Sequence, residues 1–135
     1  MSSRGNYNEA VIEKFRANAG KVDGPNSLIL LTTTGAKSGQ PRVSPVAYST
    51  DGDRLIVLAS KGGAPTNPDW YFNLVANPVV TVEQGAETFQ ARASLANEDE
   101  YERLYSQHAA LMPGFAEYRT KTTRKIPVIV LERIS

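Results

Sequence analysis

Residues 28–49 constrain the fold most, because they contain two strand-like runs joined by a turn that is rich in helix breakers. Residues 28–34 (LILLTTT) combine leucine with β-branched residues and have the length of a buried strand. Gly35 ends this run, and the turn 35–41 carries a second glycine and a proline before another strand at 42–49. The pattern predicts two adjacent strands.

The turn 35–41 has the composition of an anion-binding site. Its glycines allow main-chain N–H groups to converge, and Lys37 and Arg42 place positive charge on either side. A charge-assisted hydrogen bond to a phosphate or carboxylate is worth roughly 1.5–3 kcal/mol. A solvated hairpin loop with two incidental cations would have the same composition, so the turn alone leaves both interpretations open.

A second pair of glycines follows the third expected strand. Residues 54–60 are almost continuously apolar, and the Asp-Gly pair at 51–52 predicts a tight hairpin before them. The three strands are expected to form a meander that brings Ser60 near the turn 35–41. Gly62 and Gly63 then precede a helix at 68–76, which Asn67 would cap. Such glycines let the backbone approach a flat ligand, although an ordinary strand-to-helix connection is the alternative.

An amphipathic helix is expected at the N-terminus, with Asn8 as its cap and Gly20 as its stop. Its apolar positions include Val11, Ile12 and Phe15, which would pack on the domain or rest on a bilayer surface. The mixed charges on its other face favour packing on the domain. We therefore divide the chain into a helix and link, residues 1–27, and one main domain, residues 28–135.

The second half of the chain predicts a hairpin at 79–84 and 87–95 and a helix up to Leu111. Asn97 and Glu100 form a capping-box signature for that helix. His108 on its apolar stripe is expected to be a half-buried packing residue rather than a base. The segment 112–118 is either core or a lid over an apolar ligand. A basic run follows and is expected to be a solvated loop; it comprises Arg119, Lys121, Arg124 and Lys125. A last strand is expected at 126–134.

Six strands and three main helices without a βαβ rhythm predict an antiparallel α+β barrel. At 135 residues and 41% apolar content, the chain suffices for one domain. Its net charge of +1 argues against nucleic acid as a partner. No apolar run approaches the roughly 20 residues of a membrane span, so the expected compartment is the cytoplasm.

The sequence lacks the residues of several catalytic centres. It has no cysteine and a single histidine, which excludes thiolate chemistry and multi-histidine metal sites. The spacings of a P-loop, a Rossmann glycine motif and a hydrolase nucleophile elbow are missing. A chain without its own nucleophile, base or metal would take its reactivity from a cofactor.

Two separated motifs resemble a known family. TTTGAKSGQPRVSPV, followed by LASKGGAPTNPDWYFNLVANPVVTV and later by IPVIVLER, is similar to the deazaflavin-dependent nitroreductases, the class A coenzyme F420-dependent oxidoreductases. The resemblance implies an FMN-binding-split-barrel-like fold that binds F420. It also implies transfer of a hydride from reduced F420 to an acceptor such as a quinone or a nitroaromatic.

The resemblance assigns site residues. Lys37, Ser38 and Arg42 would hold the phosphate and glutamate tail, and residues 58–61 would meet the deazaflavin ring, with Ser60 and Tyr118 as catalytic residues. The full set of implied cofactor-binding residues is Ala36, Lys37, Ser38, Arg42, Val43, Ser44, Pro45, Val46, Ala47, Leu58, Ala59, Ser60, Lys61, Gly62, Gly63, Asp69, Trp70, Tyr71, Phe72, Asn73 and Phe115.

The acceptor pocket departs from the typical nitroreductase, which lines it with several tyrosines. The corresponding positions here are Ala47, Met112 and Phe115, and only Tyr118 remains. Fewer phenolic donors favour an apolar, quinone-like acceptor over nitroaromatics. Three alternatives are an FMN-dependent enzyme, a non-catalytic module that binds F420 or a lipid-like ligand, and a weak peripheral membrane contact through the N-terminal helix. The chain is expected to be a monomer or a weak dimer.

Overall fold

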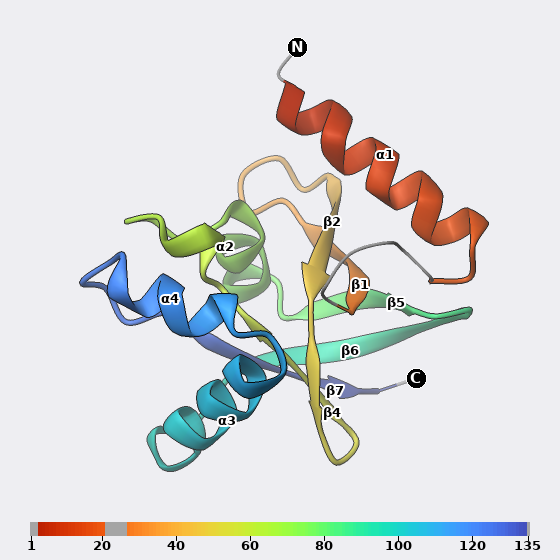
Figure 1. Ribbon diagram of the computed structural model, residues 1–135. Helices are drawn as coiled ribbons and strands as arrows, with labels where there is room; N and C mark the ends of the chain where they lie inside the picture. Colours follow the sequence, from red (N-terminus) through yellow and green to blue (C-terminus); the bar gives the residue numbers. More distant parts are fainter. Residues whose placement is uncertain (1–2, 21–26, 135) are drawn as a thin grey trace.

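The computed structural model describes residues 3–20 and 27–134 (Figure 1). Its strands are β1 (Leu28–Thr34), β2 (Pro41–Ala47), β3 (Ser49–Asp51), β4 (Arg54–Leu58), β5 (Val79–Gln84), β6 (Glu87–Leu95) and β7 (Val128–Arg133). Its helices are α1 (Ser3–Ala17), α2 (Asp69–Ala76), α3 (Glu98–Leu111), α4 (Gly114–Thr120) and the short 3₁₀ helix η1 (Lys61–Gly63).

The strands form one antiparallel sheet whose two ends are joined by the chain itself. The order is β2-β1-β5-β6-β7-β4-β3, so β2 and β3 lie at opposite ends. Only Tyr48 separates β2 from β3 in the sequence. A sheet whose terminal strands are consecutive in this way must curl, and the α+β split barrel predicted from the sequence is confirmed.

Two details of the predicted sheet are wrong. The described residues form seven strands rather than six, because the expected strand 42–49 is divided at Tyr48. The expected meander is also incomplete: β2 pairs only with β1, while β3 pairs with β4. The remaining neighbours of β1 and β4 are β5 and β7, strands far away in the sequence.

The core consists of two clusters on the two sides of the sheet. One lies inside the barrel and includes Ile29, Leu31, Val57 and Ile129. The other packs α3 and α4 against β4 and β7 through residues such as Tyr105 and Phe115. Alternate residues of β4 and β7 enter different clusters, as the period-two geometry of a strand requires.

The helix ends differ from the predicted ones in three places. Asn8 lies inside α1 rather than at its start. Pro68, not Asn67, occupies the N-cap position of α2. Asn97 is the N-cap residue of α3, but its side chain makes no capping hydrogen bond, and the Glu100 carboxylate binds Arg54 instead. The sequence pattern therefore located the helices but misassigned the side chains that end them.

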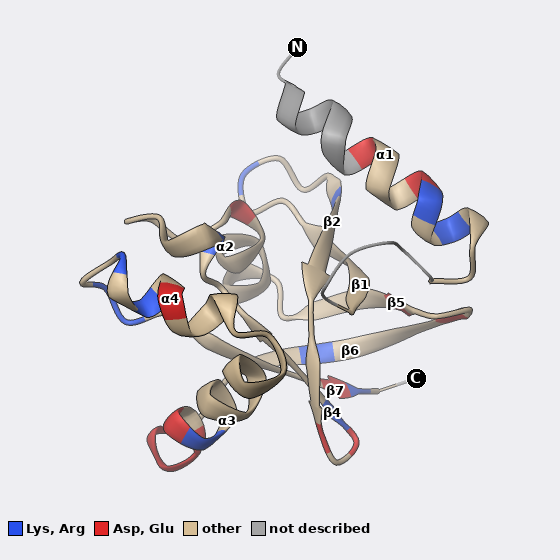
Figure 2. Ribbon diagram, viewed as in Figure 1, with Lys and Arg blue, Asp and Glu red and all other residues tan. Residues whose placement is uncertain are grey.

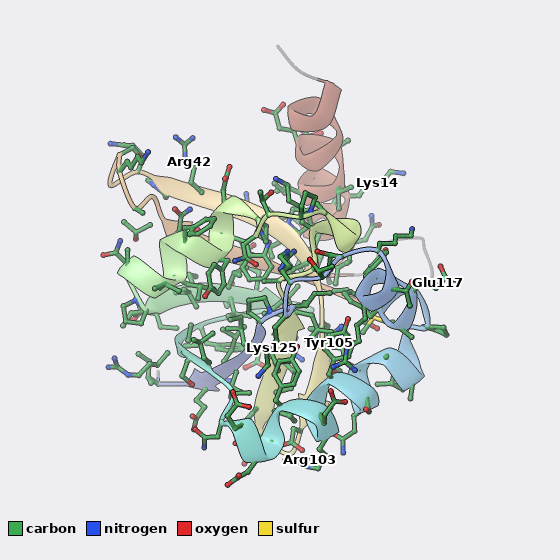
Figure 3. All side chains as sticks on the ribbon, turned by 90° about the vertical axis from the view of Figure 1, so that its left-hand side faces the viewer. Lys14, Arg42, Arg103, Tyr105, Glu117 and Lys125 are labelled. Carbon is green, nitrogen blue, oxygen red and sulfur yellow. The ribbon has the colours of Figure 1, made fainter. Side chains whose placement is uncertain are left out.

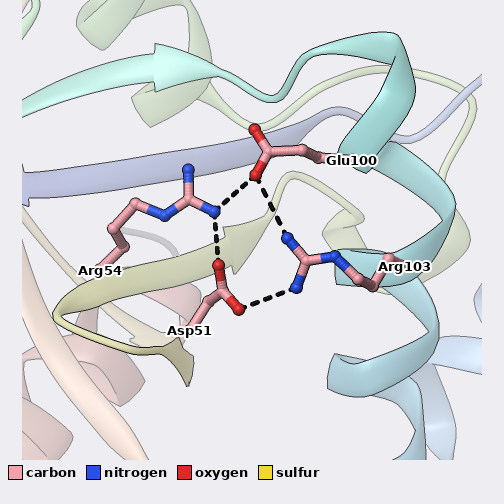
Figure 4. Close-up of polar contacts among 4 residues, drawn as sticks. All are labelled: Asp51, Arg54, Glu100 and Arg103. Carbon is pink, nitrogen blue, oxygen red and sulfur yellow. Dashed lines mark hydrogen bonds and ion pairs between the residues drawn. The ribbon is translucent and has the colours of Figure 1, made fainter.

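A four-residue ion-pair network joins the β3–β4 hairpin to α3 (Figure 4). The Arg54 guanidinium donates to both Asp51 and Glu100, and Arg103 also donates to both. Hydrogen bonds from Arg103 and Arg54 lower the pKa of the Asp51 carboxyl to about 2. The four side chains keep 22–47% of their surface exposed, so solvent screens each pair.

Helix α1 is attached to the barrel near the β5–β6 hairpin. Arg16 makes a two-bond ion pair with Glu83, and the Phe15 side chain is only 1% exposed. A Cβ atom on Gly20 would lie 2.5 Å from the Cα atom of Gly85, so the two backbones touch. Because Phe15 is buried, the face proposed for membrane contact is not free, and that contact is not supported. None of the described helices is long and apolar enough to cross a bilayer.

Candidate cofactor site

A cavity of about 840 Å³ opens between β2 and the end of β4. Its volume lies within the range of roughly 300–1,000 Å³ that is usual for small-molecule sites. Helices α2 and α4 and the η1 segment complete its walls. The lining residues are Arg42, Ser44, Pro45, Val46, Ala47, Leu58, Ser60, Lys61, Gly62, Pro68, Asp69, Trp70, Phe115 and Tyr118.

A second cavity, of about 920 Å³, continues from the first toward the turn after β1. Arg42, Ser44, Asp69 and Trp70 line both, so the two cavities adjoin, and the term groove covers both. The second cavity is further lined by Glu9, Ile12, Gly35, Ala36, Lys37, Ser38, Pro41, Val43, Phe72 and Asn73. The two glycine-containing loops that the sequence singled out therefore line adjoining cavities, the turn after β1 the second and the loop after β4 the first.

The loop after β4 has an unusual backbone. Lys61, Gly62 and Gly63 have φ angles of 49°, 65° and 84°, all in the left-handed region. For a non-glycine residue such as Lys61 this conformation costs of order 1–3 kcal/mol and persists only where the surroundings enforce it. A Cβ atom on Gly62 would meet nothing within 4 Å, whereas one on Gly63 would lie 2.9 Å from the Cβ atom of Lys121. Gly62 thus leaves space at the cavity, and Gly63 permits close packing behind it.

Arg124 helps to hold the loop after β4 in this conformation. Its guanidinium donates hydrogen bonds to the carbonyl oxygens of Ala59, Ser60 and Ala64 and to the Oδ1 atom of Asn67, at 2.6–3.1 Å. The prediction that the basic run is a solvated loop is therefore wrong for Arg124. It is also wrong for Arg119, which lies in α4 and pairs with Glu102, whereas Lys125 is exposed in the loop as predicted and makes a surface ion pair with Glu98.

The turn 35–40 is held at its base and from α2. The Gly35 N–H donates to the Gln40 carbonyl at 2.8 Å, and the Gln40 N–H donates to the Ser38 Oγ atom at 3.1 Å. The Ala36 N–H donates to the Oδ1 atom of Asn73, whose Nδ2 group donates to Thr33 at 3.1 Å. The Ser38 hydroxyl thus has a partner within the turn, and the Ala36 amide has its partner in α2.

Asn73 is expected to act as a stability residue for this turn. Asn73→Leu would remove both hydrogen bonds of a side chain that is 8% exposed and leave the Thr33 hydroxyl and the Ala36 amide without these partners. We expect a loss of about 2 kcal/mol in the free energy of unfolding, because each unsatisfied buried group costs about 1–3 kcal/mol. Urea denaturation measures the loss. Asn97→Leu is the control, since Asn97 makes no side-chain cap bond; an equal loss in both variants would contradict the assignment.

Three cations at the groove have no ion pair in the part of the chain that the structure describes, a property that they share with Lys14, Arg92, Lys121 and Arg124. Lys37, Arg42 and Lys61 form no ion pair with any carboxylate in residues 9–20 and 27–134, whereas Arg16, Arg54, Arg103, Arg119, Lys125 and Arg133 all do. Figure 2 shows the basic residues at the turn and on β2, and Figure 3 shows Arg42 extending from the edge of the fold there. An anion in the groove would meet three cations that have no ion pair, and two carboxylates, Glu9 and Asp69, also line the groove.

Some of the residues expected at the site lie elsewhere. Ala59 is fully buried and Gly63 is also buried, and neither lines a cavity. Met112 is 5% exposed within the cluster between α3, α4 and the sheet, so its expected place in the acceptor pocket is wrong. Tyr71 packs against the barrel core. These side chains support the walls without forming them.

The apolar wall of the first cavity is rigidly supported. The Phe115 and Tyr118 rings make an edge contact at 5.2 Å between centroids, and the Phe115 ring makes another with His108 at 4.5 Å. The Tyr105 hydroxyl donates to the Phe115 carbonyl at 2.7 Å. The ring is thus contacted by two aromatic neighbours and its main chain is bound by a third, which favours a fixed surface for a ligand.

His108 is a structural residue rather than a catalytic one. It is fully buried, not half-buried as expected, and its Nδ1 atom shares a hydrogen bond of 2.7 Å with Ser49. Its Nε2 atom has no hydrogen-bond partner among the residues described here. Burial lowers the pKa of the imidazole to about 4. His108 lines neither cavity, so it cannot act as a base on a ligand bound there.

Comparisons with known proteins agree with this geometry. The family described as F420H(2)-dependent quinone reductase matches residues 7–133. An F420H(2)-dependent quinone reductase from Mycobacterium tuberculosis (strain H37Rv) is 39% identical over 116 residues, which are 84% of this chain and 78% of that protein.

Two solved structures are similar over most of the chain. A structure of an F420-H2 dependent reductase, FDR-A, has 40% identity and a TM-score of 0.73 over 82% of this chain and 96% of that one. A structure described as a domain-swapped dimer has 34% identity and a TM-score of 0.75 over 97% and 100%. With the family match covering nearly the whole sequence, the chain belongs to the F420H(2)-dependent quinone reductase family.

Proposed function

We propose that this protein transfers a hydride from reduced coenzyme F420 to a planar, quinone-like acceptor in the first cavity. Its family makes it an F420H2-dependent oxidoreductase with coenzyme F420 as cofactor. The proposal adds the acceptor class and the residues that bind and position both molecules. The observation that carries it is the pair of adjoining cavities: the first joins the aromatic side chains of Trp70, Phe115 and Tyr118 to the cations Arg42 and Lys61, and the second extends from Arg42 to Lys37.

The residues present fit the parts of F420. Trp70, Phe115 and the glycine at 62 offer aromatic surface and free space for a fused ring. Lys37 and Arg42 lie along the second cavity, where an acidic tail would have its phosphate and carboxylates bound by charge-assisted hydrogen bonds.

The combined length of the two cavities favours F420 over FMN as the cofactor. FMN carries one phosphate close to its ring system, and the first cavity with Arg42 would suffice for it. The second cavity extends the binding surface past Arg42 to Lys37 and Ser38, which suits a longer acidic tail. Family membership points in the same direction.

The chain's own residues would orient the reactants and supply a proton. Reduction of a quinone to a hydroquinone consumes one hydride and one proton. The Tyr118 phenol, partly exposed at the cavity, and the Ser60 hydroxyl are the candidate donors. Val46, Ala47 and Leu58 exclude water from the ring-binding end, and the fixed Phe115 ring limits where the acceptor can lie.

Oxidation of F420H2 with menadione and with a nitroimidazole tests the acceptor class. We expect kcat/KM for menadione to exceed that for the nitroimidazole by at least about tenfold, because one phenol replaces several donors near the acceptor. The absorbance of F420H2, followed over time, gives kcat/KM for each of the two acceptors. In the matched variant Tyr118→Phe, kcat with menadione should fall while the Kd of F420 stays unchanged.

Two results would change the proposal. Equal or better reduction of the nitroimidazole would contradict a quinone-like acceptor. Tight F420 binding without F420H2 oxidation across quinones, enones and nitroaromatics would instead favour a non-catalytic binding module.

We further propose that the chain is a monomer or a weak dimer, and light scattering at micromolar concentration would test this. A similar structure is described as a domain-swapped dimer, so a stable dimer that does not dissociate on dilution is the result that would contradict this proposal.

A further inference from the structure

The four hydrogen bonds of Arg124 converge on one segment of the cofactor site. All its acceptors lie between Ala59 and Asn67, 57–65 residues away in the sequence. This segment contains Ser60, Lys61 and Gly62, which form one wall of the first cavity, whereas Arg124 does not line it. Arg124 therefore lies behind the wall, and its contacts reach the cavity only through the segment.

The direction of these bonds fixes the orientation of two amide groups. One Arg124 nitrogen, Nη2, donates to the carbonyl oxygens of Ala59 and Ser60, at 3.1 and 2.9 Å. None of the described peptide bonds is cis. In a trans peptide the C=O and the N–H point in opposite directions. The N–H groups of Ser60 and Lys61, which belong to these two peptides, therefore point away from Arg124.

These two N–H groups are available to a ligand. Neither donates a hydrogen bond to a main-chain carbonyl in the part of the chain that the structure covers. Both belong to residues that line the first cavity. A cation bound to the carbonyl side of a peptide also polarises its N–H and strengthens any bond that the N–H donates.

We propose that Arg124 is a positioning residue for the cofactor: it holds the Ser60 and Lys61 amides as a pair of donors for the carbonyl-bearing edge of the bound ring. The inference rests on the proposed function, because it assigns the ring to the first cavity. It explains why a guanidinium serves here, since one nitrogen spans two successive carbonyls while the others reach Ala64 and Asn67. It also explains how the left-handed backbone at Lys61 is maintained.

Titration of F420 fluorescence against Arg124→Ala, Arg124→Lys and the wild-type chain tests this role. We expect Arg124→Ala to raise the Kd of F420 by at least about tenfold and Arg124→Lys by at least about threefold, because an ammonium lacks the planar fork. The KM of F420H2 should rise with the Kd, while the KM of menadione stays within about twofold. Arg103→Ala is the matched control, since Arg103 belongs to the surface network of Figure 4 and lines neither cavity.

Chemical rescue separates positioning from general support of the fold. About 10 mM guanidinium chloride should recover at least about threefold of the lost affinity of Arg124→Ala, because the free cation can occupy the same carbonyl cluster. It should not improve binding by the wild type or Arg103→Ala. Circular dichroism identifies any variant that fails to fold, and Arg124→Lys then decides the question.

The outcomes are distinguishable. Wild-type affinity in a folded Arg124→Ala or Arg124→Lys would overturn the inference, and so would a loss that guanidinium does not restore and that raises both KM values equally. Failure of the wild-type chain itself to bind F420 would overturn the proposed function, and the role of Arg124 with it.

Discussion

Replacing Arg42 with glutamate is expected to weaken F420 binding by more than about 100-fold, since 1.4 kcal/mol corresponds to tenfold in Kd. Arg42 lines both cavities and pairs with no carboxylate of the residues that the structure describes. The substitution removes a charge-assisted bond worth roughly 1.5–3 kcal/mol and places a carboxylate against the acidic tail. Fluorescence titration of F420 gives the Kd directly.

A matched variant controls for the change in net charge. Arg92 lies exposed on β6, outside both cavities, so Arg92→Glu alters the charge of the protein by the same amount. Its Kd for F420 should stay within about twofold of the wild type, because exposed charges beyond roughly 10 Å are screened at 0.1 M salt. Equal affinities in Arg42→Glu and the wild type would place the tail elsewhere.

The second large expected effect is a loss of stability in mild acid that depends on His108. Burial lowers the imidazole pKa from 6.5 to about 4, so the folded protein binds fewer protons than the unfolded chain between these values. The neutral imidazole therefore contributes full stability above pH 6.5, and this contribution is lost as the pH falls toward 4. A shift of this size corresponds to about 3 kcal/mol.

Urea denaturation at intervals from pH 7 to pH 4 measures this loss. His108→Gln is the matched variant, because an amide can keep a hydrogen bond to Ser49 and does not titrate. The slope between pH 6.5 and 4 should be markedly smaller in the variant. Asp51 contributes to a different range, since its pKa falls from 3.8 to about 2. Parallel curves for the two proteins would show that His108 is not the titrating group.

The sequence predicted those parts of the fold that local pattern determines. The strand at 28–34, the hairpin at 79–84 and 87–95 and the helix ending at Leu111 all occur as expected. Each has the alternation, turn residues or capping position that short-range physics requires. The nearness of two loops was also predicted, since the turn at 35–41 and the loop after β4 line adjoining cavities.

The failures concern contacts between residues far apart in the chain. Arg124 stands in a basic run, and nothing in that run indicates that its hydrogen-bond acceptors lie at 59–67. His108 and Ser49 are likewise 59 residues apart. Met112 looked like a pocket residue beside Phe115, but the turn between α3 and α4 directs only Phe115 and Tyr118 to the cavity. Such pairings depend on the closed sheet and have no local signal.

The position of Tyr48 between β2 and β3 makes the fold sensitive to chain length at this point. Residues on either side of it belong to strands at opposite ends of the sheet order, and each strand has its own register, Ala47 opposite Leu28 and Ser49 opposite Ile56. Because side chains alternate along a strand, adding or removing one residue here would turn either the groove-lining or the core-facing positions inside out. This position should therefore tolerate substitution far better than any change of length.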